Sequence, residues 1–178
     1  MANFYSDSHG ERWGVLIQEK TMSCGPAAVA MTEVYYKSGI VANLEARVRK
    51  LSQKYPDGFT EEGGTNVTNL VSVLRSEGIK SYDALYAQPG GVWPYLHAYA
   101  NDNTPVIVHI SWTPGAGHFA VCACVYKKDQ RCIFLDPWYG LVEIGGSSLP
   151  TYTVGDSTGS FPAVANGRLS GWIIVTKR

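Results

Sequence analysis

The chain has 178 residues, of which 45% are hydrophobic and 17% are charged, and its 15 basic side chains balance 15 acidic ones. This length suits one domain with a substantial core, and this composition is typical of a globular protein rather than a disordered one. Since the charges cancel and are scattered, we expect no binding to nucleic acid or to an anionic membrane, and no stretch approaches the roughly 20 apolar residues of a membrane span.

The first residues, MANFYSDSHGERWG, do not have the basic-then-apolar order of a secretory signal. We therefore expect a cytoplasmic protein, a protein exported by another route, or a chain trimmed of its leader. The sequence does not choose among these compartments, and it leaves the oligomeric state open.

The first half of the chain has helical periodicity. Small apolar residues on nearly all sides predict a buried helix over residues 25–37. Asn43 is expected to cap a second helix, and Thr65 a third that ends at Gly78. Residues 92–101 predict a short fourth helix, with a proline in its first turn.

The second half changes to the β period. Runs of β-branched and aromatic residues between turn residues predict five strands, over residues 104–112, 117–127, 131–138, 141–144 and 171–177. The polar tip KKDQR predicts antiparallel pairing of the strands on either side of it. The segment 145–168, rich in Gly, Ser and Pro, is expected to be a functional flap or to contain a short strand such as Tyr152–Val154. Helices followed by strands indicate an α+β fold.

Cys24 lies directly before Gly-Pro, where the first helix is expected to begin. Thiol chemistry needs a thiolate, and the unpaired N–H groups and dipole of a helix N-terminus favour an anion. Taken alone, this cysteine would more often be a buried structural thiol. A nucleophilic cysteine also needs a base, so the residues around it decide between the two interpretations.

His118 is the best candidate for that base. It opens a predicted strand whose residues on its own side, Ala120, Cys122 and Cys124, are small. The helix after Cys24 is equally small-sided. We therefore expect helix and strand to approach closely and to bring Cys24 and His118 together.

Two further residues complete an acyl-transfer site. Asp136 ends the next strand across the hairpin, where its carboxylate would fix the tautomer of His118 and support the imidazolium. Gln18 lies six positions before Cys24, and its amide would donate to the oxyanion beside the backbone N–H of Cys24. A glutamine in a loop more commonly bonds only to the backbone.

The residues Gln18, Cys24-Gly25-Pro26, Gly117-His118-Phe119 and Asp136-Pro137-x-x-Gly140 together resemble the papain-like cysteine peptidases. The resemblance covers nearly the whole chain. It is closest to the bacterial bacteriocin-processing peptidases that cut after double-glycine leaders, and the staphopain-like effector proteases come second. The order Gln, Cys, His, Asp along the chain fits these families, and so does the motif GGTN ahead of a helix.

This resemblance implies a papain-like α+β fold, with a helical lobe over about residues 20–101, an antiparallel β lobe over about 104–178 and a cleft between them. It implies that Cys24 attacks, His118 shuttles the proton, Asp136 orients His118 and Gln18 lines the oxyanion hole. Trp138 resembles the aromatic residue that screens the His–acid hydrogen bond from water.

Trp112, Gly117 and Trp138 are the candidate substrate-binding residues, and the turn 113–117 and the segment 145–168 are candidate rims of the groove. No cofactor or metal is expected. The spacing of the three remaining cysteines is not that of a common zinc site, so they are interpreted as buried thiols. The three remaining histidines, His9, His97 and His109, are interpreted as structural or solvated.

The sequence therefore predicts a single domain over residues 1–178, a cysteine peptidase that hydrolyses a peptide or protein substrate through a thioester acyl-enzyme. Two other classes remain open. One is another acyl-transfer enzyme on the same fold, such as a deamidase or a transglutaminase-like protein, which would need the same triad. The other is a non-catalytic peptide-binding domain.

Overall fold

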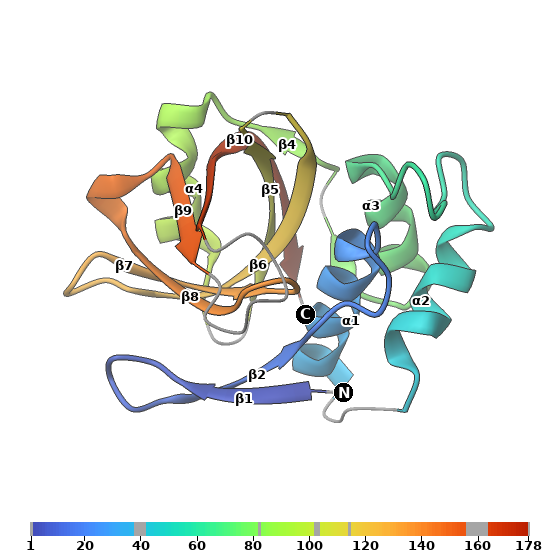
Figure 1. Cartoon of the computed structure of the whole chain (residues 1–178), viewed down its shortest axis with the longest axis horizontal. Coiled ribbons are helices and arrows are strands. Elements are labelled where there is room, and N and C mark those ends of the chain that lie inside the picture. The colour runs from blue at the N-terminus through green and yellow to red at the C-terminus, as the bar shows by residue number, and fades with distance from the viewer. Residues whose placement is uncertain are drawn as a thin grey trace.

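The structure is a computed structural model that describes residues 2–37, 42–81, 83–101, 104–113, 115–155 and 164–177. Helices lie beside a large antiparallel sheet, as Figure 1 shows, so the predicted α+β fold class is confirmed. Helical residues dominate before Val106 and strands dominate after it, as the change in sequence period indicates.

The four predicted helices are present. They are α1 (Cys24–Lys37), α2 (Leu44–Ser52), α3 (Val67–Ser76) and α4 (Val92–Tyr99), the last preceded by a short 3₁₀ turn, η1 (Pro89–Gly91). Among the helices in the described part of the chain, none combines the length and hydropathy needed to cross a bilayer.

Of the two predicted helix caps, Asn43 does occupy the N-cap position of α2 but without a side-chain bond, and Thr65 is wrong. Asn43 precedes α2 in a left-handed conformation, with φ of 58°, and its side chain makes no capping hydrogen bond. Asn66, and not Thr65, caps α3, because its side chain accepts from the backbone N–H of Asn69. The predicted stop of the first helix at residues 38–39 lies outside the described residues.

The predicted strands form one sheet of order β3-β10-β5-β6-β7-β8, with β4 and β9 also paired to β10. Their bounds are β3 (Lys80–Ser81), β4 (Leu85–Tyr86), β5 (Val106–Trp112), β6 (Gly117–Tyr126), β7 (Arg131–Asp136), β8 (Gly140–Gly145), β9 (Thr151–Gly155) and β10 (Val164–Lys177). The antiparallel pairing of β6 with β7 across the KKDQR tip is confirmed.

The segment 145–168 is largely ordered structure. It holds a 3₁₀ turn, η2 (Gly146–Ser148), then β9, which contains the short strand predicted at Tyr152–Val154, and then the first residues of β10. Residues 156–163 lie outside the described part, and with them the centre of the predicted flap.

An N-terminal hairpin, which the helical interpretation of the first half missed, consists of β1 (Ala2–Ser6) and β2 (Arg12–Leu16). Its tip is fixed on the sheet rather than frayed. Asp7 is buried and accepts hydrogen bonds from Trp13 Nε1 at 2.8 Å and from Tyr126 Oη at 2.6 Å. The hairpin thus runs from the sheet to the start of α1.

The two faces of the sheet bury two separate hydrophobic clusters. Phe119, Val121 and Ala123 of β6 belong to the cluster that also holds α1, α2 and α3. Ala120 and Cys122 belong to the other cluster, which includes residues of α4 and β9. The expectation that the small residues on the His118 side of β6 face the helix is therefore wrong.

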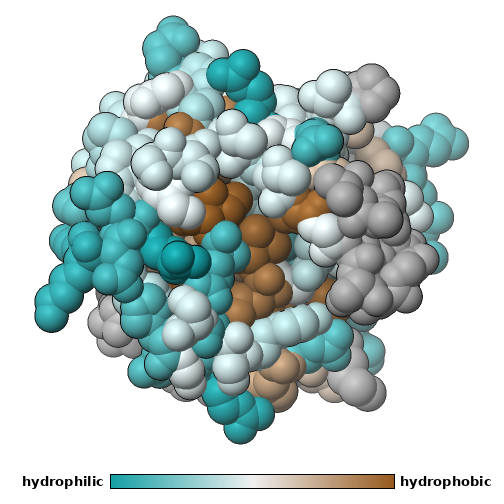
Figure 2. Space-filling view, turned by 60° about the vertical axis from the view of Figure 1, so that its left-hand side comes forward, coloured by the Kyte–Doolittle hydropathy of each residue, from teal (hydrophilic) through white to brown (hydrophobic). Residues whose placement is uncertain are grey.

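The helix α4 packs on the face of the sheet opposite α1, so the helical region expected at residues 20–101 contributes only α1 to α3 to the face on which Cys24 lies. With the side of β7, β8 and β9 turned forward, hydrophobic residues gather near the centre of the view, among residues of intermediate hydropathy and with hydrophilic residues toward the left (Figure 2).

Candidate active site

Cys24 is the first residue of α1, and its side chain is 9% exposed. The preceding residue fixes the helix start. The Ser23 carbonyl accepts from the N–H of Ala27 at 2.9 Å, and Ser23 Oγ accepts from the N–H of Lys20 at 3.1 Å. Since the first N–H groups of a helix have no partner within it, the thiol lies among backbone donors.

A buried carboxylate holds the loop before Cys24. Glu45 of α2 accepts hydrogen bonds from Ser23 Oγ and from the N–H of Glu19, and it forms an ion pair with Arg49. Burial raises the pKa of Glu45, while the Ser23 hydroxyl, the Glu19 N–H and the Arg49 charge oppose the rise. The helix α2 thereby fixes the loop from which the nucleophile candidate projects.

His118 and Asp136 lie on the neighbouring strands β6 and β7, and both side chains are fully buried. His118 Nε2 and Asp136 Oδ1 are 2.9 Å apart. His118 Nδ1 is buried and has no hydrogen-bond partner among the described residues. Cys24 lies near enough to contribute to the raised pKa of His118, and since Nε2 is engaged by Asp136, Nδ1 is the nitrogen left to face the sulfur. The three predicted residues are thus brought together.

The charge state of His118 follows from these neighbours. Burial by itself lowers the pKa of His118, but the charge and the hydrogen bond of Asp136, with a smaller contribution from Cys24, raise it to about 10. The imidazole is therefore held as an imidazolium at neutral pH, with a proton on each nitrogen.

Asp136 is a carboxylate that accepts hydrogen bonds at both of its oxygens. Besides His118, its Oδ1 accepts from the backbone N–H groups of Trp138 at 2.8 Å and Tyr139 at 3.1 Å, and its Oδ2 accepts from Tyr152 Oη at 2.9 Å. Burial raises the pKa of Asp136, but the His118 charge and these hydrogen bonds outweigh burial and lower it.

Aromatic rings surround the His118 imidazole. The ring centroid of Trp138 lies 4.7 Å away and that of Trp112 lies 5.5 Å away. Trp112 also contacts Tyr139 and Tyr152, at 6.0 and 5.8 Å. These rings keep water from the His–Asp pair, and a low-dielectric surrounding strengthens the attraction between the two charges.

Gly117 is exposed and directly precedes His118. A Cβ atom there would lie 2.6 Å from His109 Nε2, so any other residue would force the His109 ring to shift. His109 is half-buried and bonded to Ser170 Oγ through Nδ1 at 2.8 Å. Burial and the charge of His118 lower the pKa of His109, which keeps this second histidine neutral.

Gln18 is tied to the same region by its backbone. Its N–H donates to the carbonyl of Pro137 at 2.9 Å. Its side-chain Nε2 donates to the carbonyls of Lys20 at 2.6 Å and Thr21 at 2.7 Å, and Oε1 is buried with no hydrogen-bond partner among the described residues. Both amide hydrogens are thus engaged within the loop that precedes Cys24.

The other cysteines, like Cys24, form no disulfide, and His9 and His97 have partners elsewhere in the structure. Cys122 and Cys132 are buried and Cys124 is half-buried. Over the described ranges, no three His, Cys, Asp or Glu side chains gather as a metal site would require. His9 pairs with Asp129 at the hairpin tip, and His97 contacts the ring of Trp93.

The expected groove rims are described only in part. In the turn 113–117, the N–H of Trp112 donates to the carbonyl of Ala116 at 2.9 Å, while Pro114 lies outside the described residues.

Two residues that contribute to the site, Glu45 and Tyr152, belong to none of the sequence motifs. Both act through contacts with residues distant in the sequence, although the strand that carries Tyr152 was expected.

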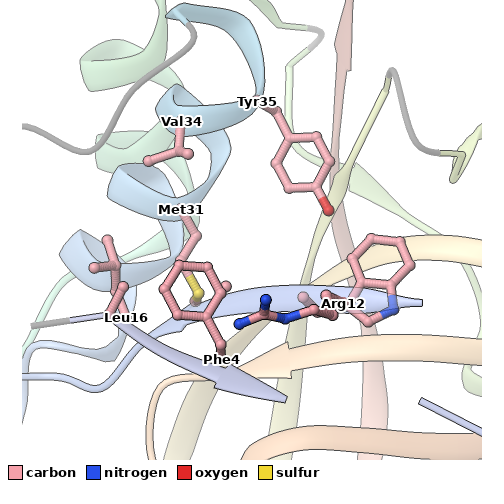
Figure 3. Close-up of a pocket in the computed structure, with 9 residues that line it drawn as sticks. Phe4, Arg12, Leu16, Met31, Val34 and Tyr35 are labelled. Atoms are coloured by element: carbon pink, nitrogen blue, oxygen red, sulfur yellow. The ribbon is translucent and has the colours of Figure 1, made fainter. Parts of the chain in front are cut away.

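A cavity of about 350 Å³ lies between the hairpin β1–β2 and α1 (Figure 3). Its lining is mostly apolar and consists of Ala2, Phe4, Arg12, Trp13, Gly14, Leu16, Met31, Val34 and Tyr35. The Arg12 guanidinium lies over the Phe4 ring, 5.2 Å from its centroid. None of Cys24, His118 and Asp136 lines this cavity, so it is distinct from the candidate active site.

Comparisons with known proteins give matches in both sequence and structure. A family model described as papain-like cysteine protease AvrRpt2 matches residues 8–153. No curated protein matches the chain. Among solved structures, the double-glycine-motif protease of an AMS/PCAT transporter, in complex with the leader peptide, is 21% identical, with coverage of 92% of this chain and 91% of that chain and a TM-score of 0.58.

Two peptidase domains of ComA are also similar in structure. That of Streptococcus ComA, a bi-functional ABC transporter involved in a quorum-sensing pathway, is 18% identical, with coverage of 92% and 98% of the two chains and a TM-score of 0.63. That of Streptococcus mutans ComA is 17% identical, with the same coverages and a TM-score of 0.55. At these identities the likeness shows the fold, helices packed on an antiparallel sheet.

Proposed function

The chain belongs to the AvrRpt2 family of papain-like cysteine proteases, and from this premise we propose that it cleaves peptide bonds with a Cys24–His118–Asp136 triad. The resemblance found in the sequence is confirmed by the family match and by the double-glycine peptidase structures. The observation that carries the proposal is one buried histidine bonded through Nε2 to Asp136, with its other nitrogen left for Cys24.

The proposed reaction begins from a thiolate at Cys24 beside an imidazolium at His118. The sulfur attacks the peptide carbonyl carbon, and the carbonyl π electrons move to oxygen to give a tetrahedral oxyanion. When the C–N bond breaks, His118 gives its Nδ1 proton to the leaving amine, and a thioester remains on Cys24. Neutral His118 then takes a proton from water as it attacks the thioester. Collapse releases the carboxylic acid and restores the thiolate–imidazolium pair.

Asp136 supports each of these steps through His118. Its carboxylate fixes the ring so that Nδ1 faces the sulfur, and it stabilises the imidazolium that forms and reforms. The pKa of about 10 that this pair gives His118 supports a resting enzyme with the acid already charged. Because both side chains are fully buried, the pair is little weakened by solvent.

The oxyanion needs donors at the carbonyl oxygen. The backbone N–H of Cys24 belongs to the first turn of α1, where N–H groups lack helical partners and the helix dipole favours negative charge. We assign the second donor to Gln18, as in the resembled family. To act so, its Nε2 must turn one hydrogen from the carbonyl of Lys20 or Thr21 to the substrate.

The substrate in this proposal is a peptide or protein, bound against Trp112, Gly117 and Trp138. The structure with the same fold that contains a leader peptide supports a peptide as the ligand. Gly117 is exposed beside His118, and the two tryptophans are half-buried around the same ring. We propose that residues 1–178 act together as one catalytic domain.

The test is a digest of a peptide library that includes Gly-Gly sites, analysed by mass spectrometry with the wild type and with Cys24→Ala. Cleavage by the wild type alone supports the peptidase. A mass increase of about 1 Da on glutamine, or a crosslink, in place of cleavage would indicate a deamidase or transglutaminase-like enzyme. Peptide binding without turnover, unchanged in Cys24→Ala, would indicate a non-catalytic peptide-binding domain.

A further inference from the structure

Tyr152 contributes to the site from outside every motif discussed above. It comes from β9, a strand that pairs with β10, and its side chain is fully buried. Phe134 and Trp112 pack edge-on against its ring, at centroid distances of 5.3 and 5.8 Å. The ring therefore has little freedom, and its hydroxyl points at Asp136 Oδ2 at 2.9 Å.

The two oxygens of the Asp136 carboxylate have unequal support. Three donors reach Oδ1, namely His118 Nε2 and two backbone N–H groups. Among the described residues, Oδ2 accepts from Tyr152. A buried charged oxygen without a donor is costly, so loss of this hydroxyl would favour rotation of the carboxylate away from its present position.

The hydroxyl of Tyr152 is a dependable donor. Burial, with the charge of the adjacent Asp136, raises the pKa of Tyr152 well above its ordinary value. The phenol therefore keeps its proton throughout the pH range in which a thiolate–imidazolium pair would work. The bond from Tyr152 to Asp136 is present whenever the carboxylate is charged.

We propose that Tyr152 is a positioning residue of the active site, whose hydroxyl holds Asp136 Oδ2 and so keeps Oδ1 on His118 Nε2 and the imidazolium facing Cys24. The inference rests on the proposed peptidase function. Its effect is also visible in the reactivity of the Cys24 thiol, which depends on the thiolate–imidazolium pair and needs no turnover.

The chain provides a matched control in Tyr126. Its hydroxyl donates to Asp7, another buried carboxylate, at 2.6 Å. Asp7 also accepts from Trp13 Nε1 and from two backbone N–H groups, so both carboxylates have one tyrosine and three other donors. Tyr126→Phe removes the same kind of bond as Tyr152→Phe, at the hairpin tip instead of at the proposed triad.

The experiment compares wild type, Tyr152→Phe and Tyr126→Phe in three measurements: alkylation of Cys24 by iodoacetamide at about pH 6, peptide turnover, and thermal unfolding. Tyr152→Phe should slow Cys24 alkylation about tenfold and lower kcat about tenfold, with KM within about twofold of wild type. Tyr126→Phe should keep the wild-type rates, and it should cost less stability than Tyr152→Phe, because Asp7 Oδ2 keeps its hydrogen bond from Trp13 Nε1. Alkylation is followed at Cys24 by peptide mapping, because the other cysteines are not protected by disulfides.

Introducing Tyr152→Phe into an Asp136→Ala variant tests whether Tyr152 acts through Asp136. In Asp136→Ala, adding Tyr152→Phe should change Cys24 alkylation by less than about twofold, because the group that the hydroxyl positions is gone. An unchanged tenfold effect in that background would overturn the proposal.

Two other results would also overturn it: rates for Tyr152→Phe equal to those for Tyr126→Phe, or a Tyr152→Phe protein that does not fold while Tyr126→Phe does. Absence of peptide cleavage by the wild type is a different failure. If Tyr152→Phe then still slows alkylation, the positioning role stands and the proposed peptidase function falls.

Discussion

Replacing Asp136 by Asn would remove the charge that holds His118 protonated while changing the shape of the side chain little. Asp136 and His118 are fully buried and 2.9 Å apart. Without the carboxylate, burial is the main remaining influence on His118, and burial lowers the pKa of this histidine below its ordinary value. We expect its pKa to fall from about 10 to below 6.5.

The free energy of unfolding of Asp136→Asn should fall together with the pKa of His118. Breaking a buried ion pair by removing one partner costs about 3–5 kcal/mol, because the remaining group is left in a low-dielectric environment. The asparagine also presents an amide group in place of one carboxylate oxygen, so either His118 Nε2 or Tyr152 Oη must change its hydrogen-bonding role. Both effects act on the same buried cluster, and the loss belongs to the cluster as a whole.

The pKa shifts of His118 and Asp136 determine at which pH values their interaction stabilises the folded protein. The folded-state pKa of His118 is raised above its unfolded value of 6.5, so its contribution to stability is fully present below about pH 6.5 and is lost as the pH rises toward 10. The folded-state pKa of Asp136 is lowered, so its contribution is present above 3.8 and is lost at lower pH. The difference in stability between wild type and Asp136→Asn should therefore be largest between these limits and shrink toward pH 10.

Chemical unfolding of both proteins from about pH 5 to pH 10, with NMR titration of the His118 ring nitrogens, measures these quantities. In Asp136→Asn, the ring should titrate below 6.5, and the alkaline loss of stability between 6.5 and 10 should be absent. A His118 ring that stays charged above pH 8 in the variant, or parallel stability curves for the two proteins, would refute the reasoning.

Three further predictions concern the residues around the thiol. Iodoacetamide should label Cys24 faster than it labels free cysteine at about pH 6, and labelling at the rate of a model thiol would contradict its activation. Gln18→Ala should lower turnover about 10²–10³-fold if the amide donates to the oxyanion, measured as kcat on a cleaved peptide, and a loss under about fivefold would leave it a structural residue. Gly117→Ala should lower kcat/KM because its Cβ would lie 2.6 Å from His109 Nε2, and His109→Ala should restore activity in that background. A double variant as impaired as Gly117→Ala alone would point to a different cause.

The residues of the proposed triad were predictable because their pattern is local. Cys24 at a helix start, and Asp136 at the end of a strand across a polar hairpin, follow from short stretches of sequence. In the structure Asp136 is bonded to His118, and Cys24 lies near enough to influence the pKa of His118. The strands were predictable for the same reason, since β-branched and aromatic runs are bounded by turn residues.

The reason given for the approach of Cys24 to His118, that small residues of β6 face the helix, was nevertheless wrong. Alternation along β6 correctly separates its two faces, but it does not say which face meets the helix. The larger Phe119 and Val121 pack on the α1 side, and an irregularity between Cys122 and Cys124 changes the alternation further along. Periodicity determines the faces of a strand, while the rest of the fold determines what covers each of them.

Contacts between distant residues were also beyond prediction. The hairpin β1–β2 has five-residue strands with Asn, Arg and Gly among their apolar residues, so its period is weak, and its tip is held by Tyr126 over a hundred residues away. Tyr152 and Glu45 similarly stabilise Asp136 and Ser23 across the fold. A single sequence carries no local signal for such pairs.

The backbone bond from Gln18 to Pro137 joins the two sides of the site in a way that side-chain mutation does not alter. One partner precedes the helix with the thiol, and the other directly follows the acid. Both groups belong to the main chain, so every residue at position 18 except proline can make the bond. The amide at this position can therefore be exchanged during evolution without separating the segment that leads to the nucleophile from the turn that follows the acid.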